Sequence, residues 1–129
     1  MKEILLISEN PEIIQSFTAM LSPVYDVISV RSQQEGLEVL KKDFRRISAV
    51  LTDLKLARSD GFFCAKEMQS FSPLSPIPLI AISADLPDDI DMDCIEHGFF
   101  DLINMKTPPL LVHQRIGNAI RAKDSLSLH

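Results

Sequence analysis

The stretch ISAVLTD, Ile47–Asp53, is the clearest indication of the fold class of this chain. Its residues are small or apolar up to Thr52 and show no alternation of polar positions, which is typical of a strand buried on both faces of a parallel sheet. Open parallel sheets bind ligands and carry out chemistry at the carboxyl ends of their strands. We therefore expect the carboxylate of Asp53 to lie at the edge of the sheet where a functional site forms.

Four other apolar runs predict the remaining strands: Ile4–Ile7, Tyr25–Val30, Ile77–Ser83 and Phe100–Asn104. The segments between the runs have helical spacing. The expected helices are a first one that follows Asn10 and Pro11, a second over Gln33–Lys42, a third from about Gly61, a fourth over Pro87–His97 and a fifth over Pro108–Lys123. Strand and helix alternate five times, which predicts an α/β fold: a doubly wound, five-stranded parallel sheet with (βα)5 flavodoxin-like topology.

Length and composition bound the class of protein. A chain of 129 residues fits one domain, expected over residues 1–124, with a short polar tail over 125–129. The net charge of −5 argues against nucleic-acid binding. No apolar run reaches the length of a membrane span and the N-terminus has no signal-peptide layout, so we expect a cytoplasmic location. Cys64 and Cys94 have no metal-ligand spacing and are expected to be reduced and buried.

Polar residues follow the predicted strands at the edge that holds Asp53. Ser8 and Glu9 follow the first strand, and Ser83 ends the fourth. Two carboxylates, a backbone carbonyl just past Asp53 and water would suit Mg²⁺, which prefers oxygen ligands. A cation there would relieve the repulsion between Glu9 and Asp53. Because aspartyl phosphates are established covalent intermediates, Asp53 is a candidate nucleophile toward phosphorus.

At these positions the chain resembles the receiver domain of bacterial response regulators, and the resemblance covers nearly all of it. The motifs that carry it are VLTDLKL at Val50–Leu56, the pair Asp60-Gly61, IPLIAISA at Ile77–Ala84, and Gly98 followed by Asp101. Each motif is weak alone, but their order and spacing together are specific.

The resemblance implies a role in two-component or phosphorelay signalling rather than a classical enzyme activity. It implies that Asp53 accepts a phosphoryl group from a histidine kinase or phosphotransfer protein, and that the Ser83 hydroxyl bonds the phosphoryl oxygen. It further implies that the Lys55 carbonyl, with Glu9 and Asp53, holds Mg²⁺. A downstream effector protein and dimerisation are possible under the same resemblance.

The chain departs from the family at three places. Ser8 stands where the family usually has a second acid, so it is at best a weak metal ligand. Met105 stands where the family has a lysine after the fifth strand, and Lys106 follows it, from where its ammonium could still reach the site. Leu102 replaces the aromatic residue that switches in the family.

These departures favour an alternative function: a degenerate receiver that acts through protein contacts without phosphorylation. A third candidate, a small metal-dependent phosphohydrolase, is weaker. Its second aspartate would stand two residues after Asp53, and Lys55 occupies that position.

Overall fold

A computed structural model describes residues 1–71, 76–84 and 96–127 of the chain. Five parallel strands form one sheet in the order β2-β1-β3-β4-β5. This order confirms the predicted doubly wound α/β fold. The strands are β1 (Glu3–Ile7), β2 (Asp26–Val30), β3 (Ile47–Asp53), β4 (Leu79–Ser83) and β5 (Asp101–Asn104).

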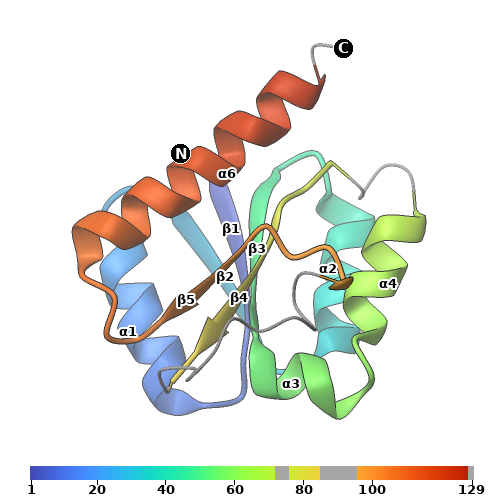
Figure 1. The fold of residues 1–129 in the computed structure, drawn as a ribbon, viewed down its shortest axis with the longest axis horizontal. Helices are drawn as coiled ribbons and strands as arrows, with labels where there is room; N and C mark the ends of the chain where they lie inside the picture. The colour runs from blue at the N-terminus through green and yellow to red at the C-terminus, as the bar shows by residue number, and fades with distance from the viewer. Residues whose placement is uncertain (72–75, 85–95, 128–129) are drawn as a thin grey trace.

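Helices cover both faces of the sheet. Figure 1 shows α1 and α6 on one face, and α2 and α4 on the other. Among the described residues, no helix is both long and apolar enough to cross a membrane. The helices are α1 (Pro11–Leu21), α2 (Gln33–Asp43), α3 (Leu54–Ser59), α4 (Phe63–Ser70) and α6 (Pro109–Ser127).

Alternate residues of the strands divide the core into two clusters. Leu5 and Ile7 of β1 face the cluster that contains the buried side chains of α2 and α4. Ile4 and Leu6 face the cluster that contains those of α1 and α6. All four β1 side chains are fully buried. This is the consequence of a side-chain period of two in a strand covered on both faces.

The first helix begins where the sequence predicts. The Asn10 side chain accepts a hydrogen bond of 2.9 Å from the Glu12 amide, and Pro11 occupies the first helical position, where its missing N–H costs nothing. Ile13, Phe17 and Leu21 form the buried stripe of this helix. Their spacing of four residues places them on one face of it.

The segment after Asp53 differs from the expectation. The short helix α3 was not predicted, and the next helix, α4, begins at Phe63 rather than at Gly61. The reason is a break in the backbone between the two helices: Gly61 (φ 64°) and Phe62 (φ 62°) both adopt left-handed conformations. Such a conformation is unusual for a residue other than glycine.

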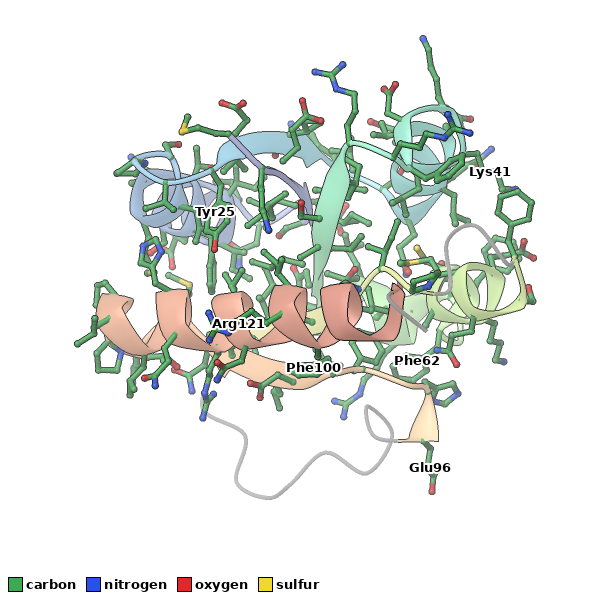
Figure 2. The ribbon with its side chains drawn as sticks, turned by 90° about the horizontal axis from the view of Figure 1, so that it is seen from above. Tyr25, Lys41, Phe62, Glu96, Phe100 and Arg121 are labelled. Carbon is green, nitrogen blue, oxygen red and sulfur yellow. The ribbon has the colours of Figure 1, made fainter. Side chains whose placement is uncertain are left out.

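Aromatic packing accompanies the unusual backbone of Phe62. The Phe62 ring is buried and stacks on the His97 ring with 4.1 Å between centroids, and it meets Phe99 edge-on at 6.1 Å. Figure 2 shows Phe62 and Glu96, the neighbour of His97, at the same end of the molecule. These contacts offset part of the backbone strain.

The C-terminal helix is longer than expected. Helix α6 continues to Ser127, past the expected end of the helix at Lys123 and into the segment expected to be a short polar tail. The helix packs on α1 through His113, whose Nε2 lies 2.9 Å from the Met20 carbonyl oxygen. Its Arg121 lies near Tyr25, the residue before β2, and both side chains are labelled in Figure 2. Burial raises the pKa of Tyr25, and the charge of Arg121 opposes that rise.

Other expected strands differ from the structure at their first residues, β1, β2 and β5 by one residue each, and one expected helix lies largely outside the described residues. The fourth strand begins at Leu79 rather than Ile77, because Pro78 has no N–H for the ladder and only its carbonyl accepts, from the Val50 amide at 3.0 Å. The predicted helix over Pro87–His97 lies outside the described residues as far as residue 95. Cys64 is buried, as predicted, whereas Cys94 also lies outside the described residues.

Candidate functional site

The register of the sheet brings the carboxyl ends of four strands to one edge. Ile7 is paired with Thr52, Asp53 with Ile82, and Ser83 with Asn104. The residues that follow β1, β3, β4 and β5 therefore share this edge, as expected for parallel strands.

Asp53 is held at this edge by two hydrogen bonds, one to each carboxylate oxygen. The Ser8 hydroxyl donates to Oδ2 at 3.0 Å, and the Lys55 amide donates to Oδ1 at 3.0 Å. The second bond makes Asp53 the N-cap of α3. With 5% of its surface exposed, Asp53 is a buried charge whose two oxygens both have donors.

A cleft of about 600 Å³ opens above Asp53. Its wall combines the loop after β1, the start of α1, helix α3 and the end of β4. The lining includes two carboxylates, two cationic side chains and two hydroxyls. The residues are Glu9, Asn10, Ile13, Asp53, Leu54, Lys55, Leu56, Arg58, Ser59, Ser83 and Ala84.

The cleft contains most of the residues that the sequence indicated. Glu9 is exposed and Ser83 is half-buried, and both line the cleft together with Asp53 and Lys55. Ser8 lies beneath it, fully buried.

The residues after β5 are placed differently. Lys106 is exposed and does not line the cleft, and its backbone amide donates to the Asn104 side chain at 2.8 Å. Met105 is half-buried and packs against the apolar cluster under α1 and α6. Leu102 packs against the other cluster, where it offers neither a ring nor a hydroxyl. The cationic groups of this cleft therefore come from Lys55 and Arg58, at α3.

Gln33 holds the α3 segment that lines the cleft, a role that the sequence did not predict. Its side chain is buried, and its Nε2 donates to the Leu56 carbonyl at 2.6 Å and to the Asp60 carboxylate at 2.8 Å. Asp60 also accepts from the Phe63 amide at 3.2 Å. These bonds tie α2 to the middle of α3 and to Asp60, which follows that helix. A glutamine at the first turn of a helix carries no sequence signal for such a role, because its partners lie more than twenty residues away.

The donor set is compatible with a hard cation, although it is sparse. Glu9, Asp53 and Lys55 all line the cleft, so its candidate oxygen donors are two carboxylates and one backbone carbonyl. Oxygen donors of this kind match Mg²⁺, which keeps several waters and needs only one or two carboxylates. Within the part of the chain that the structure describes, no group of three or more His, Cys, Asp or Glu side chains is arranged to hold a metal ion.

Comparison with known proteins identifies the family. The response regulator receiver domain matches residues 4–116 of this chain. The chain belongs to this family. Receiver domains are signalling phosphoacceptor modules of two-component systems rather than classical enzymes; they pair with histidine kinases and bind Mg²⁺ in their active sites.

Curated relatives of this receiver chain are longer proteins. The transcriptional regulatory protein GlrR of Escherichia coli is 25% identical over 118 residues, which are 91% of this chain and 26% of GlrR. The probable transcriptional regulator ycf27 of Porphyridium aerugineum is 30% identical over 127 residues, 98% of this chain and 51% of the relative. This receiver chain thus spans between a quarter and about half of these two relatives.

Solved structures share the fold of this receiver. A response regulator receiver domain protein from Clostridium thermocellum superposes with a TM-score of 0.82 at 23% identity, covering 98% of this chain and 99% of the other. The receiver domain of a Pseudomonas aeruginosa sensor histidine kinase, solved with a magnesium ion coordinated in its active site cleft, gives 0.79 at 23% identity, covering 92% and 97%.

Proposed function

We propose that this receiver accepts a phosphoryl group on Asp53. The observation that carries the proposal is the placement of that carboxylate: it lines a cleft at the carboxyl edge of the sheet, and both of its oxygens are fixed by hydrogen bonds. A fixed carboxylate is oriented for attack before the donor arrives, which lowers the entropic cost of the reaction.

The transfer forms one bond and breaks one. A carboxylate oxygen of Asp53 forms a bond to phosphorus as the bond between phosphorus and the imidazole nitrogen of a phosphohistidine donor breaks. The electron pair of the broken bond stays on the imidazole nitrogen, which takes up a proton. Because Asp53 enters as a carboxylate, no proton has to leave the nucleophile.

The residues of the cleft have separate roles in this proposal. The Ser83 hydroxyl, at the adjacent strand end, bonds a phosphoryl oxygen. Glu9, Asp53 and the Lys55 carbonyl would hold Mg²⁺. Lys106 is a proposed auxiliary cation that would have to turn in from its exposed position outside the cleft. When bound, the cation offsets the negative charge of the carboxylates and of the phosphoryl oxygens.

Phosphorylation can be tested by intact-mass spectrometry after incubation with Mg²⁺ and a small phosphodonor such as acetyl phosphate. We expect one added phosphoryl group in the wild type and none in Asp53→Asn. Asp26→Asn is a matched control, because Asp26 is an exposed carboxylate at the opposite end of the sheet. Equal labelling of the wild type and Asp53→Asn would contradict the proposal, as would no labelling by either acetyl phosphate or a phosphorylated kinase domain.

A second candidate function is a protein-interaction module that works without phosphorylation. It is favoured by Met105, which packs against the core at the position of the family's lysine, and by the exposed Lys106 outside the cleft. Without a cation from that loop, a phosphoryl group would lose a charge-assisted hydrogen bond, which contributes about 1.5–3 kcal/mol. Phosphorylation that depends on Mg²⁺ and changes the affinity for a partner would exclude this function.

A further inference from the structure

Ser8 replaces an acid directly beneath Asp53, and its hydrogen bonds define what it does there. Its side chain is fully buried, and its Oγ lies 3.0 Å from Oδ2 of Asp53 and 3.1 Å from the amide nitrogen of Asn10. An ionised carboxylate has no hydrogen to donate, and an amide N–H has no lone pair to offer. The hydroxyl hydrogen therefore points at Asp53, and a hydroxyl lone pair points at Asn10.

This arrangement satisfies the buried carboxylate without a cation. Each oxygen of Asp53 has a donor, Ser8 on one side and the Lys55 amide on the other. A hydrogen bond to an ionised acceptor is about twice as strong as a neutral one. A carboxylate at position 8 would instead place a second negative charge against Oδ2, and a bound cation would offset the repulsion.

We propose that Ser8 is a positioning residue that holds Asp53 by donating a hydrogen bond in the place of a metal ion. The inference rests on the proposed function of Asp53 and adds how its site is maintained: the carboxylate is oriented in the cation-free protein. A cation that approaches Oδ2 meets the hydroxyl hydrogen, so Ser8 competes with Mg²⁺ and does not ligate it. The presence of Ser8 in place of an acid then has two results: Mg²⁺ binds weakly, and the Asp53 carboxylate keeps its orientation without a cation.

Mg²⁺ titration of the full chain separates a donor from a ligand at position 8. We follow the backbone amide resonances of Asn10 and Lys55 by NMR and obtain the dissociation constant from their shifts. If Ser8 is a donor, Ser8→Ala binds Mg²⁺ at least as tightly as the wild type, since the competing hydrogen is gone. If Ser8 is a ligand, the same variant binds several-fold more weakly, and that result would overturn the inference.

Adding a carboxylate supplies the complementary test. We expect Ser8→Asp to bind Mg²⁺ at least about tenfold more tightly than the wild type, because the charge of the ligand set tunes affinity. Its melting temperature should be lowered in EDTA and restored by Mg²⁺, whereas that of the wild type should change less between the two conditions, because it binds Mg²⁺ more weakly. Ser29→Asp is the matched control, since Ser29 is exposed on β2. A wild type that Mg²⁺ stabilises as much as Ser8→Asp, or a Ser8→Asp variant with no gain in affinity, would overturn the inference.

Neither the Mg²⁺ dissociation constant nor the melting temperature depends on phosphoryl transfer. If Asp53 fails to accept a phosphoryl group while the Mg²⁺ responses follow the expected pattern, the proposed function fails and the role of Ser8 stands. If Asp53 is phosphorylated but Ser8→Ala weakens Mg²⁺ binding, the role of Ser8 fails and the proposed function stands.

Discussion

Gly36 of α2 offers a sharp test of how tightly this helix packs on the sheet. A Cβ atom added at Gly36 would lie 2.5 Å from Cδ1 and 3.0 Å from Cγ1 of Ile7, the last residue of β1. Ile7 is fully buried, so a shift of its side chain would disturb the close-packed core around it. The Gly36→Ala substitution therefore overpacks the core directly before Ser8.

Two opposing terms set the expected magnitude. Alanine in a helix interior is favoured over glycine by about 1 kcal/mol. Overpacking a filled core costs about 1–3 kcal/mol. We expect Gly36→Ala to lower the free energy of unfolding by about 1 kcal/mol overall, since the overpacking term is the larger of the two.

Gly117 of α6 is the matched control for the same substitution. The three heavy atoms nearest to a Cβ atom there all belong to the guanidinium of Arg121, the end of a flexible side chain, and the closest lies at 3.3 Å. Gly117→Ala should therefore stabilise the protein by up to about 1 kcal/mol. The two variants are compared by urea denaturation followed by far-UV circular dichroism, because the chain has no tryptophan for fluorescence.

A double mutant identifies the clash. Ile7→Val removes Cδ1, the closest atom, at a cost of about 0.5–1.5 kcal/mol. In the Ile7→Val background, Gly36→Ala should be nearly neutral or stabilising, so the two changes should not be additive. If Gly36→Ala stabilises the wild type as much as Gly117→Ala does, the inferred close packing of α2 on β1 is refuted.

Three further predictions concern other parts of the molecule. Gln33→Leu should destabilise the protein by about 1–3 kcal/mol, because the Leu56 carbonyl and the Asp60 carboxylate lose their shared donor. The control Gln34→Leu, at an exposed position, should change stability little, and equal effects of the two variants in urea denaturation would contradict the role of Gln33. Phe17→Ala should cost about 3–5 kcal/mol in the same assay, since the ring is fully buried between α1 and the sheet, and a loss below that of an exposed control such as Gln15→Ala would count against this packing. Burial, together with the charges of Asp60 and Glu67, raises the pKa of Cys64 from 9.0 to about 12. The folded state therefore binds the Cys64 proton more tightly than the unfolded state, so the free energy of unfolding should fall as pH rises from about 9 toward about 12. In a Cys94→Ser background, Cys64→Ala should reduce this dependence of stability on pH, and an unchanged dependence would show that Cys64 does not cause it.

The amino-acid sequence predicted the sheet because buried parallel strands are continuous apolar runs. The run that ends at Asp53 gave the bounds of β3 to the residue, and Asn10 with Pro11 gave the start of α1. Local signals were sufficient in both places. They failed at α3, since a helix of six residues is too short to show periodicity and starts because Asp53 itself caps it. They failed again at Phe62, whose left-handed backbone is supported by rings distant in the sequence.

The same division applies to the candidate site. The sequence was enough to list the chemical groups: a carboxylate at a strand end, a nearby second acid, and a serine and a methionine where the family has an acid and a lysine. The positions of these groups relative to one another depend on the packed sheet. Ser8 and Asp53 are 45 residues apart, and their hydrogen bond exists because β1 and β3 are neighbours in the sheet. The direction of donation follows from the chemistry of the two partners of the Ser8 hydroxyl: the Asn10 amide donates to it, and it donates to the Asp53 carboxylate that strand pairing brings within reach.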